Sequence, residues 1–315
     1  MEFLTVTGSV PVEQAHLADA HAHLWINPPE GLAPESRFEL TDYDRIKAEL
    51  EDFRAAGGTT LVDCQPGGCG RDANKLIEFS QATGLHVTAT TGFHLQKYYS
   101  PQYWLWSASA EQAAAYFIEE LTAGMRETGS KARATIIKVG YEGVIEGQTK
   151  VLMEAAAEAA RQTGATILFH TERGRNVEAL LPFFTTHGIS ASQLYMCHVD
   201  KRPDFGLHRE LAREGVLLGY DTFARPKYDP ERTTWPLLRE MVAAGLEGSI
   251  AIGLDLADAS MWQHFGGQPG MLMIPNTIVP RLYAEGMSKT IVTRLTAQNI
   301  AARLVRQPQH ERDGA

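Results

Sequence analysis

Short runs of apolar and β-branched residues alternate along the chain with longer segments whose composition is helical. The strand-like runs occupy residues 17–21, 59–64, 86–91, 134–139, 165–170, 194–198, 216–220 and 249–254. The intervening segments include residues 43–56, 110–127, 151–162 and 231–244, which have the composition of helices. This alternation is typical of βα units that build a parallel sheet.

Glycines mark the expected ends of several of these helices. Each one follows a helical segment and precedes the next strand, at Gly57, Gly84, Gly164, Gly188 and Gly245. Glycine readily takes the left-handed conformation that ends many helices, so its recurrence indicates repeated βα units. An open, doubly wound sheet usually has a glycine-rich phosphate loop after its first strand, and residues 18–25 contain no glycine. The pattern therefore predicts an α/β fold of the (β/α)8 barrel type.

Length and composition agree with one large barrel domain. The chain has 315 residues, 44% of them hydrophobic and 21% charged, and α/β barrels commonly form one unit of about 250 residues. No linker rich in proline, glycine or serine divides the sequence. We expect a single domain over residues 1–315, with only residues 307–315 as a frayed tail.

Charge and targeting signals exclude several classes of partner. Lys plus Arg number 29 against 38 Asp plus Glu, which gives a net charge of -9 and no basic surface for nucleic acid. The first 14 residues lack the basic and apolar regions of a signal peptide, and no segment has the roughly 20 apolar residues that a membrane span needs. The three cysteines have no paired spacing, which fits a reducing compartment. We expect a soluble, cytoplasmic protein that acts on a small molecule, with neither nucleic acid nor membrane as a partner.

Ionisable residues stand at the carboxyl ends of five predicted strands. His21 and His23 are two residues apart, so in a strand both imidazoles point to one face. Active sites of barrels are built at this end of the strands. A charged or titratable group directly after an apolar strand is costly unless it is paired, hydrogen-bonded or bound to a metal. The sequence therefore predicts one metal site, made by His21, His23, Lys138, His170, His198 and Asp255.

These six positions resemble the ligand set of the phosphotriesterase-like family of the amidohydrolase superfamily. The resemblance implies that His21, His23 and Asp255 bind one divalent ion and that His170 and His198 bind a second. It also implies that Lys138, carboxylated on its side-chain nitrogen by CO2, bridges the two ions. The likeness covers nearly the whole chain, including Gly57-Gly58-Thr59, Val62-Asp63, Gly70-Arg71-Asp72, Thr91-Gly92-Phe93-His94, Tyr98-Tyr99 and Asn299-Ile300-Ala301-Ala302-Arg303.

The chemistry of the residues supports this resemblance. A free Lys138 ammonium would repel two divalent cations, whereas a carbamate would give an oxygen to each of them. Two ions can hold a bridging hydroxide at neutral pH and polarise a carbonyl or phosphoryl oxygen. Asp255 would take the proton of that hydroxide and pass it to the leaving group. These ligands suit zinc, with manganese, cobalt and iron as alternatives, so we expect a metal-dependent hydrolase; the family resemblance also suggests a homodimer.

The loops resemble the sugar-lactone subgroup of that family, which includes phospho-furanose lactonases. The stretches that carry the likeness are residues 221–228, 255–262, 265–270 and 279–282. The likeness implies a lactonase, and the alternative is a phosphotriester, phosphoester or N-acyl amide hydrolase using the same site. A binding protein that keeps the barrel without its chemistry would lack a metal ligand, and none is missing.

One departure from the subgroup leaves the substrate open. Where the phosphorylated-lactone enzymes have an arginine and a tyrosine that hold the phosphate, this chain has Asp258 and Met261. Either Asp258 binds a hydroxyl of an unphosphorylated sugar lactone, which we prefer, or other cations bind an anionic group. The candidate cations are Arg173, Arg175, Arg225 and Lys227. Further candidates for substrate contact are Tyr98 and Tyr99, after the third strand, and His264, in a loop expected to face the mouth of the barrel.

Overall fold

The computed structural model describes residues 1–307 and confirms the predicted (β/α)8 barrel. Its parallel strands are β3 (Ala18–Ala22), β4 (Thr60–Asp63), β5 (His86–Thr88), β6 (Thr90–Phe93), β7 (Ile136–Tyr141), β8 (Ile167–Thr171), β9 (Leu194–Cys197), β10 (Leu217–Tyr220) and β11 (Ile250–Ile252). β3, β4 and β5 pair in parallel in chain order, and so do the strands from β6 to β11. No ladder joins β5 to β6 in the described part of the chain. β5 and β6 are thus two halves of the run predicted at residues 86–91, interrupted at Ala89.

The barrel closes between its first and last strands. The N–H of Asp255, three residues beyond β11, donates to the carbonyl of His21 in β3 at 2.9 Å. The N–H of Leu254 donates to the carboxylate of Asp19, also in β3, at 3.1 Å. These bonds bring the residues that follow the last strand beside the first strand, although more than 200 positions separate them in sequence.

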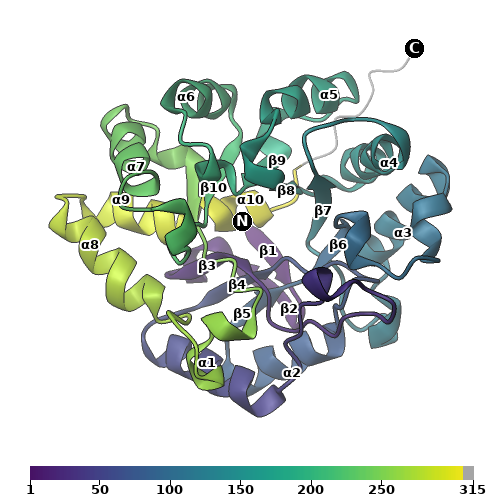
Figure 1. The fold of residues 1–315 in the computed structure, drawn as a ribbon, viewed down its shortest axis with the longest axis horizontal. Helices are drawn as coiled ribbons and strands as arrows, with labels where there is room; N and C mark the ends of the chain where they lie inside the picture. The colour runs from purple at the N-terminus through teal and green to yellow at the C-terminus, as the bar shows by residue number, and fades with distance from the viewer. Residues whose placement is uncertain (308–315) are drawn as a thin grey trace.

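Helices surround the strands as a ring (Figure 1). Their bounds are α1 (Tyr43–Ala55), α2 (Ala73–Thr83), α3 (Ala110–Thr122), α4 (Gly147–Thr163), α5 (Leu180–Thr186), α6 (Phe205–Glu214), α7 (Thr234–Ala243), α8 (Val279–Ala284), α9 (Lys289–Thr293) and α10 (Asn299–Leu304). Gly84 and Gly164 end α2 and α4 in the left-handed conformation, as predicted. α3 is shorter than the predicted segment 110–127 because Gly124, at φ +139°, follows its last turn.

The amino-terminal residues form a hairpin that the sequence analysis does not predict. β1 (Glu2–Thr5) and β2 (Gly8–Pro11) pair antiparallel. Phe3 and Val10 pack in one cluster with the first residues of the barrel strands, among them Ala18 and Ile136, and with Ile300 of α10. The hairpin therefore covers the amino end of the barrel with apolar side chains. Strands of four residues are too short to show a period in the sequence.

Gln307, the first residue of the predicted frayed tail, is held by hydrogen bonds to the rest of the barrel. The N–H of Gln307 donates to the carbonyl of Gly164 at 2.9 Å, and its side-chain carbonyl accepts from the Ser192 hydroxyl at 3.2 Å. The rest of the predicted tail, residues 308–315, lies outside the described residues. Among residues 1–307, we find no helix with the length and apolar composition to cross a membrane.

Candidate metal centre

The six predicted ligands lie at the carboxyl end of the barrel. His21 belongs to β3, Lys138 to β7 and His170 to β8, while His23, His198 and Asp255 directly follow or lie close beyond a strand. All are buried except His170, which is partly exposed. The rings of His21 and His198 stack with their centroids 4.7 Å apart, and those of His170 and His198 are equally close. The barrel thus brings together residues separated by up to 234 positions.

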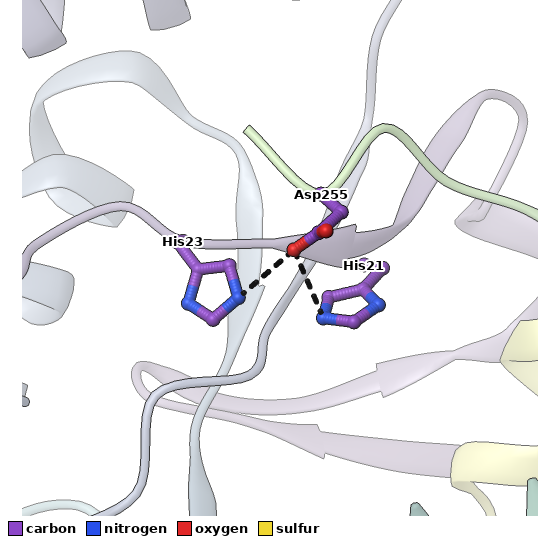
Figure 2. A group of neighbouring side chains, drawn as sticks. All are labelled: His21, His23 and Asp255. Atoms are coloured by element: carbon purple, nitrogen blue, oxygen red, sulfur yellow. Dashed lines mark ion pairs between the residues drawn. The ribbon is translucent and has the colours of Figure 1, made fainter. Parts of the chain in front are cut away.

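His21, His23 and Asp255 form a first group of potential ligands (Figure 2). The Nε2 atoms of His21 and His23 lie 3.7 and 3.5 Å from Oδ1 of Asp255. The opposite ring nitrogen, Nδ1, is engaged in both residues, by Asp221 Oδ2 at 2.9 Å and by Gln65 Oε1 at 2.8 Å respectively. Because Nδ1 of each ring donates a hydrogen bond to its acceptor, Nε2 is the nitrogen whose lone pair a neutral ring would present to the carboxylate. Lone pairs and a carboxylate repel one another unless a cation lies among them, so this group fits a metal ion.

The pKa values of the two rings are shifted in opposite directions. Burial lowers the pKa of His23 to about 4, so that its ring is neutral at neutral pH. Burial also acts to lower the pKa of His21, but Cys64, Cys197 and Asp255 outweigh it and raise that pKa well above the usual value. The Nε2 atom of His21 is buried and has no hydrogen-bond partner among the described residues. The place beside His21 favours a positive charge, which a metal ion would supply.

His170 and His198 form the second group. Nδ1 of His198 lies 2.7 Å from Asp221 Oδ1, which leaves Nε2 as the unprotonated nitrogen. That Nε2 lies 3.0 Å from Nδ1 of His170. Burial lowers the pKa of His198 to about 4 and that of His170 well below its usual value. Two neutral imidazoles with converging nitrogens fit a second divalent ion.

Lys138 lies close enough to both groups to act on them electrostatically. Its side chain is fully buried, and its charge lowers the pKa of both His23 and His170. Nζ donates to the carbonyl of Cys64 at 2.8 Å, the one hydrogen bond that Nζ makes within residues 1–307. An ammonium has three protons to donate and is costly to bury beside neutral rings. The surroundings therefore fit a lysine that carries a carboxyl group and faces two cations.

Asp221, directly after β10, orients both groups. Its two carboxylate oxygens accept from His21 and His198, and the backbone N–H of His198 donates to it at 3.2 Å. Burial would raise the pKa of Asp221, but the positive character of His198 and His21 holds it well below the usual range. The sequence analysis assigns Asp221 no role. It directly follows its strand, as His23 and His198 follow theirs, and that position is the signal that could have identified it.

A cavity of about 190 Å³ opens beside these residues. His23, His170 and Asp255 form part of its wall, and so do four of the predicted substrate residues, Tyr98, Arg225, Lys227 and Asp258. The size suits a small molecule rather than a polymer. The side chains that line the cavity come mainly from the loops that follow the strands.

The other four predicted substrate residues do not line this cavity. Tyr99 is buried, and its hydroxyl accepts from the backbone N–H of His94 at 2.8 Å. It therefore holds the loop after β6 and does not line the cavity. His264 pairs with Asp52 of α1 through Nε2 at 2.8 Å. Arg173 and Arg175 are exposed, the side chain of Arg173 by 72%. The loop after β8 directs these arginines to the surface, which spacing along the chain does not reveal.

Further cavity residues were missed by the sequence analysis as substrate contacts. They include Glu172, Lys201 and Tyr228. The ammonium groups of Lys201 and Lys227 lie 5.5 and 5.1 Å from the centre of the same Tyr228 ring. Neither lysine is in an ion pair with any residue in the described part of the chain. Lys201 follows His198 by three residues, and this closeness to a predicted ligand is the signal that could have drawn attention to it.

Comparisons with known proteins relate the whole chain to one family. The model of the phosphotriesterase family matches residues 1–303. A phospho-furanose lactonase from Mycoplasmopsis synoviae (strain 53) is 28% identical over 314 residues, covering 94% of this chain and 89% of the relative. An N-acetyltaurine hydrolase from Xenopus tropicalis is 25% identical over 307 residues, covering 92% and 86%. The crystal structure of an amidohydrolase from Mycoplasma synoviae aligns with a TM-score of 0.91 at 28% identity, covering 98% of this chain and 93% of that one.

Proposed function

Because the chain belongs to the phosphotriesterase family, we propose that it is a metal-dependent lactonase that opens a small sugar-type lactone. The observation that carries this proposal is the convergence of His21, His23, Lys138, His170, His198 and Asp255 beside one small cavity. The similarity to a phospho-furanose lactonase over 94% of the chain supports the choice of a lactone.

Two divalent ions, with zinc as the expected metal, would supply Lewis acidity and make water acidic enough to attack a carbonyl carbon at neutral pH. His21, His23 and Asp255 would hold one ion, His170 and His198 the other, and carboxylated Lys138 both. Asp255 remains ionised, because the ring of His198 and the charge of Arg225 lower its pKa against the effect of burial. It can accept the proton of the attacking water and deliver it to the ring oxygen that leaves.

The cavity wall favours a lactone that carries an anionic group. Lys201 and Lys227 offer two cations beside one ring, whereas Asp258, which is exposed, already accepts from the Ser260 N–H at 2.8 Å. A desolvated anion would gain charge-assisted hydrogen bonds from both lysines. We therefore propose an anionic lactone in place of the neutral one that Asp258 suggested, with Lys201 and Lys227 taking over the role of the missing arginine and tyrosine.

A second candidate is hydrolysis of an N-acyl amide at the same site. The observation that favours it is the similarity to an N-acetyltaurine hydrolase over 92% of the chain. The attack on an amide carbonyl uses the same ions and the same Asp255, so the metal ligands do not distinguish the two reactions. The shape and charge of the cavity wall do.

The test is a panel of sugar lactones with and without a 5-phosphate, together with N-acyl amides and phosphoesters. Metal-loaded protein is assayed by proton release, with Lys138→Ala as the control. We expect fastest turnover of a phosphorylated lactone and loss of that activity in the variant. Turnover of amides in preference to every lactone would replace the proposal by its alternative, and lactone turnover that survives Lys138→Ala would contradict the role of the metal centre.

A further inference from the structure

Arg225 lines the cavity but does not have the position of a cation that is free to bind substrate. Its Nη2 donates to Oδ2 of Asp255 at 2.6 Å and also to the backbone carbonyl of Asp255. The exposed fractions of the two side chains are 19% and 11%. Lys227, two residues further on, makes no such contact and is exposed. Arg225 is therefore bound to Asp255, whereas Lys227 is free to contact a molecule in the cavity.

Asp255 has a backbone conformation that needs support. Its φ is +52°, in the left-handed region that residues with a side chain seldom adopt. Three hydrogen bonds hold its backbone there. Its N–H donates to the His21 carbonyl at 2.9 Å, and its carbonyl accepts from the Ala257 N–H at 2.9 Å and from Arg225. Arg225 contributes the one bond of the three that comes from a side chain.

The contacts of Asp255 divide its carboxylate into two functional halves. Oδ1 faces Nε2 of His21 and of His23, while Oδ2 is held by Arg225. A guanidinium has donors in a rigid fork and does not release its protons at any pH at which the protein is folded. A proton taken up by Asp255 therefore cannot pass to Arg225 and has to leave toward the cavity.

We infer that Arg225 is a positioning residue, which fixes both the backbone and the carboxylate of Asp255 so that Oδ1 is presented to Nε2 of His21 and of His23. The inference rests on the proposed function for the role of Asp255, and it reassigns Arg225 from substrate binding. Removal of a hydrogen bond to a ligating carboxylate typically lowers metal affinity or activity by about 10- to 100-fold.

The test compares Arg225→Met with Arg225→Lys. Retention of metal is measured by elemental analysis after dialysis against a chelator, with no substrate present. We expect Arg225→Met to retain less metal than the wild type and to have a kcat lower by about 10- to 100-fold with little change in KM. Arg225→Lys should recover part of both, because an ammonium keeps the charge but lacks the fork that serves two acceptors.

Two control variants distinguish this positioning role from a general effect of losing a cation and from a loss of substrate binding. Arg232→Met removes an arginine with a side chain 85% exposed, outside the cavity, and should behave as wild type. Lys227→Met should raise KM for an anionic lactone without loss of metal. Metal retention of Arg225→Met equal to or above that of the wild type would overturn the inference, and so would a rise in KM alone. Failure of the wild type on every lactone would instead count against the proposed function, because metal retention is measured without a substrate.

Discussion

The metal-ligand side of the site and the substrate side are held in different ways. Five of the six ligands are buried, and His21, His23 and His198 each have Nδ1 fixed by Asp221 or Gln65. On the other side, Lys227 and Asp258 are exposed residues in loops. The strand ends thus form a rigid centre for chemistry, and the loops form a wall that can vary with the substrate.

The largest effect that this comparison predicts follows from removing the support of the rigid side. Asp221→Asn removes the carboxylate that accepts hydrogen bonds from both His21 and His198. It should lower kcat/KM or metal affinity by about 10- to 100-fold. Kinetics and metal titration measure it. Asp229→Asn, in the exposed loop after the same strand, is the matched control. If both variants retained full activity, the rigid side would not depend on Asp221.

The protonation of the ligand histidines gives a second test of the rigid side. His23 and His198 have pKa values of about 4, and so does His208, a buried histidine that bonds the Tyr220 hydroxyl at 2.8 Å outside the metal centre. Burial lowers the pKa of all three below the ordinary value of 6.5. As the pH falls, these histidines therefore take up protons in the unfolded chain before they do so in the folded protein. Their contribution to stability is therefore present above pH 6.5 and is lost as the pH falls toward 4.

NMR titration of the metal-free protein should show these three histidines neutral down to about pH 4. Added zinc should abolish the titration of His23 and His198 and leave that of His208 unchanged. A zinc effect on His208 as large as that on His23 would show that the ion does not bind at the predicted centre.

A smaller effect is expected on the substrate side. Lys227→Met should weaken binding of an anionic lactone by about 10-fold, since a hydrogen bond to a charged group contributes roughly 1.5 kcal/mol or more. Binding of a neutral lactone should not change. Comparison of KM for lactones with and without a phosphate measures the difference. Equal KM changes for both lactones would show that Lys227 does not recognise the anionic group.

The smallest effect is expected for a residue that the structure places outside the cavity. His264 pairs with Asp52 where both side chains are more than a third exposed. His264→Gln should leave kcat and KM as they are and change the free energy of unfolding by less than about 1 kcal/mol. A change in KM comparable to that of Lys227→Met would return His264 to the substrate side.

The two sides also differ in how far the sequence predicts them. His170 and His198 end apolar runs of regular spacing, so the repeat of βα units alone places them at one end of a barrel. Asp221 has the same kind of position and could have been added on that basis. Arg173 and Lys227 are both cations in loops, and spacing along the chain does not show that only Lys227 faces the cavity.

The barrel and the set of potential ligands could be predicted from the amino-acid sequence alone, because the alternation of apolar runs with helical segments is local and recurs along the whole chain. The loop residues that meet those ligands could be identified only in the folded molecule. The pairing of Arg225 with Asp255, the closure of β3 on Asp255 and the hairpin beneath the barrel join segments that are distant in sequence. Such contacts depend on how the strands close in space, which no local pattern of hydrophobic and polar residues encodes.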